Sequence, residues 1–368
     1  MSISIETVRE HLKEVQHPGK NDNIVNLGMV QRVALKDNKL EVNISFEKAT
    51  DPFMGSIEKN CKAVLTKLVG SEYQVLVGTS VAKPQAPPKP ETKPLNNIKN
   101  IVAVSSGKGG VGKSTIATNL AIALAIDGYK TAILDADIFG PSIPKMFALE
   151  NHKPDTIEKD GKEWIVPAEK YGVKVLSVGF FVDGNNALVW RGPMASGALK
   201  QLLLETDWGE LDYLIIDTPP GTSDIHLTLV QTIAVTGAVI VTTPQQVALA
   251  DARKGIQMFT SKGINVPVLG LVENMSWFTP AELPENKYYI FGKDGGKHLA
   301  EEMNIPLLAE IPLVQSICES GDSGQPGTSL SHGMLGEAFR NMAANVVQQV
   351  EHRNMNIEPT KIVEITNK

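Results

Sequence analysis

The sequence predicts a large α/β domain with a doubly wound, mostly parallel sheet, preceded by a small α+β domain of order α-β-β-α-β. Three observations support this prediction. A chain of 368 residues is long enough for two domains. A proline-rich segment, residues 82–97, separates a short N-terminal part from a long C-terminal part. In the long part, continuous apolar runs alternate with helical patterns, as in parallel sheets whose strands are covered on both faces.

The N-terminal part, residues 1–81, shows two kinds of apolar periodicity. Ile5, Val8 and Leu12 recur at the spacing of a helix. Between residues 40 and 46 apolar and polar residues alternate, which is typical of a strand with one buried face. The predicted elements are a helix over 5–15, a hairpin over 29–47 with its turn at Asp37–Asn38, a helix over 57–68 and a strand over 73–81.

The C-terminal part divides into a linker over 82–97, a folded domain over 98–350 and a tail over 351–368. The linker carries five prolines among lysines and polar residues, a composition that favours an extended, semi-rigid chain. A closing helix is expected over 333–350. The buried strands are predicted over 100–106, 130–137, 211–220, 237–244 and 266–274.

Composition excludes several classes of protein. The net charge is −6, which gives no reason to expect a nucleic-acid partner. No apolar run approaches the length of a membrane span, and the first residues lack the apolar core of a signal peptide, so we expect no membrane partner. The chain has only two cysteines, Cys61 and Cys318, which fits a reducing cytoplasm. Both are interpreted as structural thiols, Cys61 on the apolar stripe of its helix.

The strongest motif lies in IVAVSSGKGGVGKSTIATNLAIALAIDG, residues 101–128. Its glycines and its Gly-Lys-Ser ending fit a phosphate-binding loop between a strand and a helix. Backbone N–H groups of such a loop point inward around phosphates, and the helix N-terminus adds a favourable dipole. Lys113 is expected to contact the β- and γ-phosphates and Ser114 to bind Mg²⁺. The predicted contacts are Gly107, Lys108, Gly109, Gly110, Val111, Gly112, Lys113, Ser114 and Thr115.

Lys108 stands directly after the first glycine, where an ordinary phosphate loop needs no lysine. With this residue, KGGVGKST resembles the deviant Walker A loop of the ATPase family that includes nitrogenase iron protein, the cell-division ATPase MinD and the plasmid-partitioning ATPases. The resemblance implies ATP as the ligand and a homodimer that holds nucleotides between its subunits. Lys108 would then reach the partner's nucleotide and stabilise charge on the transferring phosphoryl group.

Two aspartate motifs follow in the order that this family shows. LDADIFGPS contains Asp135 and Asp137 and resembles switch I, in which the second aspartate positions the attacking water. LIIDTPPGTSD contains Asp217, which resembles the Walker B acid that holds the Mg²⁺ shell, and Gly221 of switch II. The implied catalytic residues are Lys108, Lys113 and Asp137, and the implied Mg²⁺ ligands are Ser114 and Asp217.

A closer resemblance covers nearly the whole chain except the linker and the tail. DADIFGPS, WRGPM at 190–194, IIDTPPGTSD, ENMS and GDSGQP at 321–326 resemble the Mrp-type (ApbC-like) iron–sulfur cluster carriers. The small α-β-β-α-β domain resembles the iron–sulfur-assembly domain often fused in front of them. The resemblance implies cluster delivery to apoproteins, contact with other assembly factors, and a role for Asn274 in binding adenine.

The sequence departs from this family after ENMS. Relatives carry a C-x-x-C pair there, and two subunits together hold a [4Fe–4S] cluster with four thiolates. Here the segment reads FTPAELPENKYYIFG, and no cysteine occurs from 62 to 317. Cys318 would give two thiolates per dimer, while Glu282 and Glu285 are poor ligands for a cluster that prefers sulfur. The ligands of any cluster are therefore unknown, and residues 277–293 are interpreted as an interface or partner-docking loop.

Two functional hypotheses follow. The first is a dimeric ATPase that carries or assembles iron–sulfur clusters, which the small domain and the WRGPM and GDSGQP matches favour. The second is a nucleotide-dependent dimerisation switch without a cluster, as in the partitioning and MinD-type proteins, which the missing cysteines favour. An ordinary phosphoryl-transfer kinase fits less well, because Lys108 implies a partner subunit in the active site.

Overall fold

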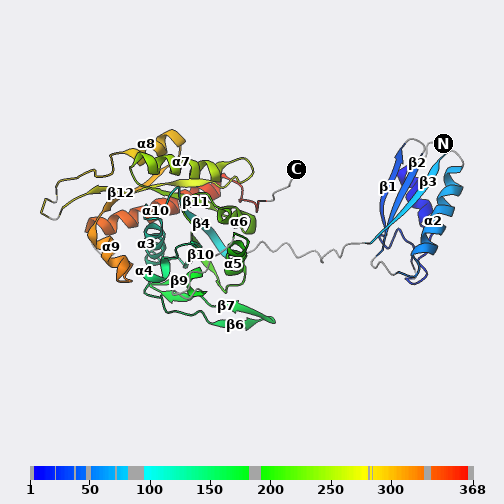
Figure 1. The fold of residues 1–368 in the computed structure, drawn as a ribbon, viewed down its shortest axis with the longest axis horizontal. Coiled ribbons are helices and arrows are strands. Elements are labelled where there is room, and N and C mark those ends of the chain that lie inside the picture. Colours follow the sequence, from blue (N-terminus) through cyan, green and yellow to red (C-terminus); the bar gives the residue numbers. More distant parts are fainter. Residues whose placement is uncertain are drawn as a thin grey trace. The chain divides into compact units, whose positions relative to one another are not determined.

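Contacts between Cα atoms divide the chain into two units, Met1–Thr92 and Lys93–Lys368, which are described separately (Figure 1). The computed structural model describes residues 4–20, 22–36, 39–46, 51–70, 73–81, 95–181, 192–280, 282–283, 285–326 and 333–363. The predicted turn at Asp37–Asn38, most of the predicted linker, and Trp190 and Arg191 of WRGPM lie outside the described residues.

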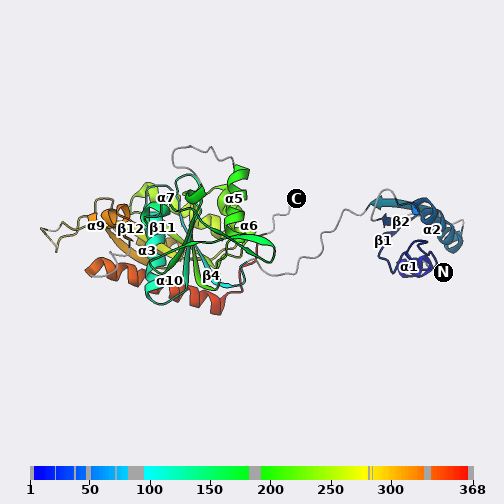
Figure 2. The ribbon, with the colours of Figure 1, turned by 90° about the horizontal axis from the view of Figure 1, so that it is seen from below.

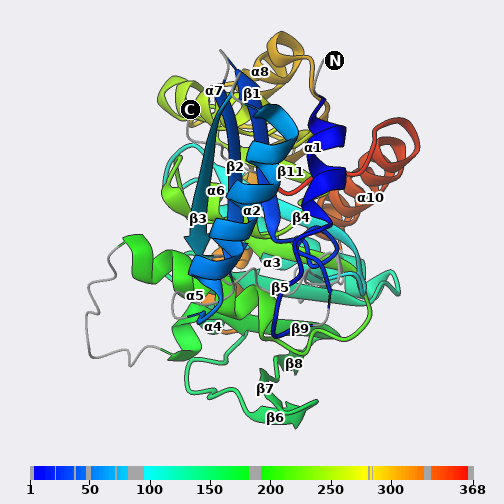
Figure 3. The ribbon, with the colours of Figure 1, turned by 90° about the vertical axis from the view of Figure 1, so that its right-hand side faces the viewer.

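The first unit has the predicted order α-β-β-α-β. β1 and β2 pair antiparallel, and β2 pairs parallel with β3, so that β2 is central. Leu40, Val42 and Ile44 alternate inward along β2, as predicted, and α1 and α2 lie side by side on the sheet (Figure 3). The elements are α1 (Ile5–Leu12), β1 (Val30–Lys36), β2 (Lys39–Phe46), α2 (Met54–Val69) and β3 (Gln74–Val81).

The second unit is built on an eight-stranded sheet of order β13-β12-β11-β4-β10-β5-β9-β8. Every neighbouring pair is parallel except β8 and β9, so the predicted doubly wound, mostly parallel sheet is confirmed. Its strands are β4 (Ile98–Ser106), β5 (Thr131–Asp135), β8 (Ala168–Lys170), β9 (Val173–Ser177), β10 (Leu211–Asp217), β11 (Gly237–Thr242), β12 (Val268–Phe278) and β13 (Leu307–Leu313). A separate hairpin is formed by β6 (Thr156–Lys159) and β7 (Lys162–Ile165).

Helices cover both faces of this sheet. α3 (Lys113–Ile126) and α10 (Gly333–Asn356) lie together on one face, while α5, α6 and α7 lie on the other (Figure 2). α3 is buried along most of its length because it is covered by both the sheet and α10, which explains why its sequence is apolar on all sides. The remaining helices are α4 (Ile143–Met146), η2 (Val178–Phe181), α5 (Gly192–Leu204), α6 (Asp224–Thr232), α7 (Gln246–Thr260), α8 (Gly295–Met303) and α9 (Gln315–Asp322).

β12 is longer than the sequence predicts. The expected strand ends near residue 274, but β12 continues to Phe278 through an irregularity in its pairing with β13. Met275, inside this irregularity, has a φ of 56°, a left-handed conformation that is uncommon for a residue with a side chain. The chain then projects as an arm before α8 (Figure 1), closed at its base by an isolated bridge between Phe278 and Tyr288. The loop between β12 and α8 is therefore shorter than the sequence predicts.

The two units have separate hydrophobic cores, and this leads to a prediction. Phe46 is fully buried in the first unit, so Phe46→Ala should destabilise that unit by about 3–5 kcal/mol through lost burial and a cavity. Native-state hydrogen exchange on the full chain should show the loss of protection in β1 and β2 and unchanged protection in β4 and β10. Leu76→Ala, which truncates a side chain that is 41% exposed on the same sheet, is the matched control. An equal loss of protection in both units would contradict the prediction.

Candidate functional site

The phosphate-binding loop connects the end of β4 at Ser106 to the start of α3 at Lys113. At two positions in this loop, only glycine fits, because any side chain would collide with a neighbouring segment. Gly112 has a φ of 84°, and a Cβ there would collide with the Asn274 side chain. A Cβ on Gly107 would collide with the backbone of Asp251 in α7. The loop borders a cavity of about 220 Å³ that also reaches Asp137 and Pro220. Of the predicted loop residues, all but Gly107 and Val111 line this concave site.

A buried charge cluster lies beneath the loop. Lys113 Nζ is 2.6 Å from Asp217 Oδ1, 3.3 Å from Ser114 Oγ and 3.6 Å from Asp137 Oδ2. Ser114 Oγ donates to the other Asp217 oxygen at 2.6 Å. The Lys113 side chain is 6% exposed and that of Asp217 fully buried, so solvent screens this pair little. Residues that are up to 104 positions apart in sequence are thus brought within hydrogen-bond distance.

Asp135 lies deeper and organises the loop that carries Asp137. Its carboxylate accepts hydrogen bonds from the backbone N–H of Asp137 at 3.1 Å, the N–H of Ile143 at 3.2 Å and Ser177 Oγ at 2.9 Å. Burial, and then the charge of Asp217, raise the pKa of Asp135 to about 8. Burial also raises the pKa values of Asp137 and Asp217, although Lys113 opposes both shifts. In all three aspartates burial is the larger effect, and Lys113 is the charge that opposes it.

The donor atoms in this cluster suit Mg²⁺. Magnesium prefers oxygen ligands and is commonly held by one or two protein groups together with substrate phosphates. Ser114 Oγ and the Asp217 carboxylate supply such oxygens directly beside the phosphate loop. A divalent cation beside these buried aspartates would favour their charged forms. Ser114 and Asp217 therefore fit the metal that the sequence predicts.

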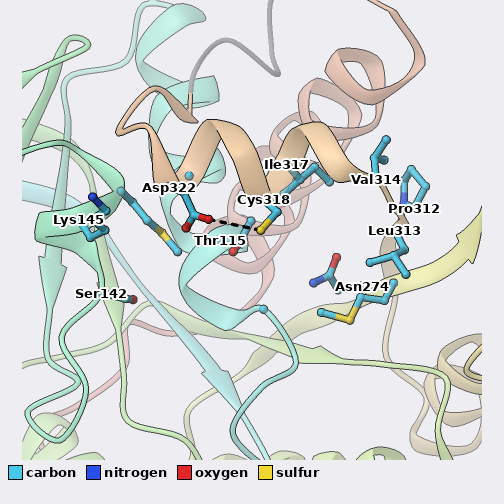
Figure 4. Close-up of a pocket in the computed structure, with 14 residues that line it drawn as sticks. Thr115, Ser142, Lys145, Asn274, Pro312, Leu313, Val314, Ile317, Cys318 and Asp322 are labelled. Carbon is cyan, nitrogen blue, oxygen red and sulfur yellow. Dashed lines mark hydrogen bonds between the residues drawn. The ribbon is translucent and has the colours of Figure 1, made fainter.

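Asn274 approaches the loop from β12. Its Nδ2 donates to the carbonyl of Val111 at 2.9 Å, and its side chain is buried. A second cavity, of about 330 Å³, opens beside it, between β12 and α9 (Figure 4). This cavity and the phosphate cavity share Gly112, Thr115, Ser142 and Met146. A ligand with its phosphates in the loop can therefore extend into the second cavity, which is the arrangement expected of a nucleotide site.

His226 is a buried residue that the sequence prediction missed. It lies in the first turn of α6, where its Nδ1 accepts from the backbone N–H of Ser223 at 3.2 Å and completes a capping box. Its Nε2 is 3.2 Å from Ser105 Oγ at the end of β4. Burial lowers the pKa of His226 to about 4. The signal in the sequence is the Ser-x-x-His spacing, in which histidine stands where a capping box normally has glutamate or glutamine.

The segment after β10 and the start of α6 are held against the end of β4, next to the phosphate loop. The N–H of Gly221 donates to the carbonyl of Ser106 at 2.8 Å, and His226 contacts Ser105. Lys108 lies in the phosphate loop and is half-buried. Its Nζ has no ion pair within the part of the chain that the structure describes.

The two cysteines lie in different surroundings. Cys61 is fully buried in the first unit, as expected, and burial raises its pKa to about 12. Cys318 was expected to be structural, which is wrong: it is exposed on α9, and its Sγ donates to Asp322 Oδ2 at 3.6 Å. Glu282 and Glu285 are exposed on the arm. Among the described residues, no group of three or more histidines, cysteines or acids is placed to hold a metal ion.

The fold and the site define a P-loop nucleotide-binding protein. Residues 97–347 match the family described as "ParA: NUBPL iron-transfer P-loop NTPase", and residues 5–77 match "Iron-sulfur cluster assembly protein". The chain belongs to the NUBPL iron-transfer P-loop NTPase family. No helix in the described ranges is long and apolar enough to cross a membrane.

Individual relatives agree with this assignment. The chain is 41% identical over 324 residues to a Synechocystis protein named iron-sulfur cluster carrier protein, covering 88% of this chain and 91% of the relative. It is 43% identical over 344 residues to an Escherichia coli protein of the same name, covering 92% and 90%. A solved nucleotide-binding protein of Archaeoglobus fulgidus, in complex with ADP, superposes with a TM-score of 0.57 at 37% identity, covering 67% of this chain and 93% of that one.

The pKa of His226 predicts a pH dependence of stability. Below pH 6.5 the unfolded chain protonates this histidine, whereas the folded chain keeps it neutral down to about pH 4. The second unit should therefore lose stability as the pH falls through this range, by about 3 kcal/mol in total from this group. Chemical unfolding measured between pH 7 and pH 4 should show a smaller pH slope for His226→Gln than for the wild type. His298→Gln, at an exposed site, should keep the wild-type slope; an unchanged slope in His226→Gln would contradict the assignment.

Proposed function

We propose that this chain binds and hydrolyses ATP as a homodimer and serves as an iron–sulfur cluster carrier or assembly factor in the cytoplasm. The observation that carries the ATPase part is the buried cluster of Lys113, Ser114 and Asp217 beneath the glycine loop. The carrier part is supported by relatives named iron-sulfur cluster carrier protein over about nine-tenths of the chain, including the small first unit.

In the proposed reaction, water attacks the γ-phosphorus of ATP, the bond between that phosphorus and the β,γ-bridging oxygen breaks, and ADP leaves. The N–H groups of residues 107–115 and the Lys113 ammonium hold the phosphates and favour the charge that develops on them. Mg²⁺, when bound by Ser114 and Asp217, neutralises phosphate charge. Asp137, held by Asp135 at the rim of the phosphate cavity, orients the attacking water and accepts its proton.

Two further residues complete the proposed site. Asn274 lines the larger cavity beside Gly112, which both cavities share, and its amide is assigned to the adenine ring. Lys108 is assigned to the nucleotide of the partner subunit, because it lines the phosphate cavity and its ammonium has no ion pair in the described part of its own chain. This second assignment makes catalysis depend on dimer formation.

A mixing experiment tests whether Lys108 acts across the dimer. Lys108→Ala and Lys113→Ala should each reduce the ATP turnover by about a thousandfold or more, since each removes a positive charge from the transferring phosphoryl group. In a mixed dimer, however, one site keeps its own Lys113 and receives Lys108 from the other subunit. An equal mixture should therefore recover about a quarter of the wild-type rate, because about half of the dimers are mixed and each has one complete site.

A mixture of Lys113→Ala with Asp217→Asn is the matched control for this experiment. Both changes damage the site of their own subunit, so no mixed dimer contains a complete site and no activity should return. Recovery in the control, or none in the test mixture, would refute the role of Lys108 in the partner's site.

The proposed cargo is an iron–sulfur cluster, and the thiols that hold it must come largely from outside the chain. The sequence has two cysteines, of which Cys61 is buried and Cys318 lines the nucleotide cavity. A [4Fe–4S] cluster normally takes four thiolates. We therefore place the cluster between this protein and a thiol donor, either a small molecule or an assembly factor, with the recipient apoprotein replacing the donor.

The second candidate function is a nucleotide-dependent dimerisation switch that holds no cluster. It is favoured by one specific observation, the arm between β12 and α8. The arm occupies the position of the missing C-x-x-C pair and exposes Leu283, Tyr288, Tyr289 and Ile290. Exposed apolar and aromatic side chains of this kind are typical of protein contact surfaces.

Anaerobic reconstitution separates the two candidates. With iron and sulfide alone, the protein should retain no stable cluster; with a thiol donor such as glutathione, it should retain iron and sulfide and show charge-transfer absorption. Cys318→Ala should behave like the wild type, because the thiols come from the donor. Failure to hold or transfer a cluster to an apoprotein under both conditions would reject the carrier and leave the switch.

A further inference from the structure

The cavity beside Asn274 has one wall that the proposed ATPase mechanism does not use. This wall is α9, which contributes Ile317, Cys318 and Asp322 (Figure 4). Among the described residues that line the cavity, Asp322 is the one with a carboxylate side chain and Lys145 is the one with a cationic side chain. Lys145 is already paired with Glu150 at 3.0 Å, whereas Asp322 has no ion pair among the described residues and accepts only a weak bond from Cys318. The carboxylate oxygens of Asp322 are therefore available to a ligand.

Asp322 lies at the place that the sugar of a bound nucleotide would reach. Thr115, at the start of α3, belongs to both cavities and lies on the path from the phosphate loop to α9. Asn274 and Leu313 line the far side of the larger cavity (Figure 4), and Met275, next to Asn274 in the chain, also lines this cavity. With phosphates in the loop and a base against this far side, the sugar lies between them, next to α9. A carboxylate is an acceptor without donors, and two vicinal hydroxyl groups can both donate to it.

We propose that Asp322 accepts hydrogen bonds from the ribose hydroxyls of the nucleotide and makes the site select ribonucleotides over 2′-deoxyribonucleotides. The proposal rests on the proposed ATP binding and specifies the substrate class of the same site. Cys318, one helical turn before Asp322, donates to Oδ2 and holds the carboxylate toward the cavity. A site that hydrogen-bonds a substrate hydroxyl rejects the analogue that lacks it, because the acceptor then loses its partner.

Equilibrium binding of ATP, 2′-deoxy-ATP and 3′-deoxy-ATP to the full chain tests the proposal. The wild type should bind ATP about tenfold or more tightly than 2′-deoxy-ATP, the range expected for a hydrogen bond to a charged acceptor. Asp322→Ala removes both acceptor oxygens, and should bind the two nucleotides within about twofold of each other. Asp322 is exposed, and thermal unfolding should show that the variant folds as the wild type does.

Glu319→Gln is the matched control. Glu319 lies on the same helix and carries the same charge, but it does not line the cavity and instead accepts from Gln315 at 2.6 Å. This variant should retain the wild-type preference. A wild type that binds no ATP would refute the proposed function itself. A wild type that binds ATP and 2′-deoxy-ATP equally, or an Asp322→Ala variant that keeps the preference, would overturn this inference alone.

Discussion

The ion pair between Lys113 and Asp217 is the interaction on which the rest of the site depends. A buried ammonium is stable only beside a compensating charge, and removing one partner of a buried pair is strongly destabilising. The parallel register of the central strands supplies this partner, since β10 lies beside β4 and Asp217 stands opposite Val104, two residues before the strand ends. Ser114 and Asp137 then take positions around the same ammonium. This buried cluster is thus a consequence of the strand order.

The segments that lead away from this pair are held by hydrogen bonds to the ends of β5 and β4. Asp135 holds the Asp137 loop, while Gly221 and His226 hold the segment after β10 against Ser106 and Ser105. Burial keeps His226 neutral, so that it can accept from Ser223 and still contact Ser105. Both segments are therefore anchored beside the cluster of Lys113, Ser114 and Asp217.

β12 connects the nucleotide cavity to the arm. It supplies Asn274 to the phosphate loop, and the adjoining Glu273 is buried with its carboxylate accepting from the N–H of Gly296 in α8. The arm begins four residues after Asn274 and is held at its base by the Phe278–Tyr288 bridge and by Lys287, whose Nζ lies 3.9 Å from the centre of the Trp277 ring. The exposed arm is therefore an extension of the strand that carries Asn274.

The sequence by itself determined the features that depend on neighbours along the chain. These are the α-β-β-α-β order of the first unit, the buried parallel strands of the second, and the phosphate loop, whose glycine spacing fits only a strand-loop-helix turn. Tertiary structure decided what depends on distant residues. It extended β12 to Phe278 through pairing with β13, exposed Cys318 on α9, and brought His226 to Ser105 and Asp322 to the nucleotide cavity. Periodicity and motifs report local backbone geometry, whereas these contacts follow from which strands and helices lie side by side, which no local pattern specifies.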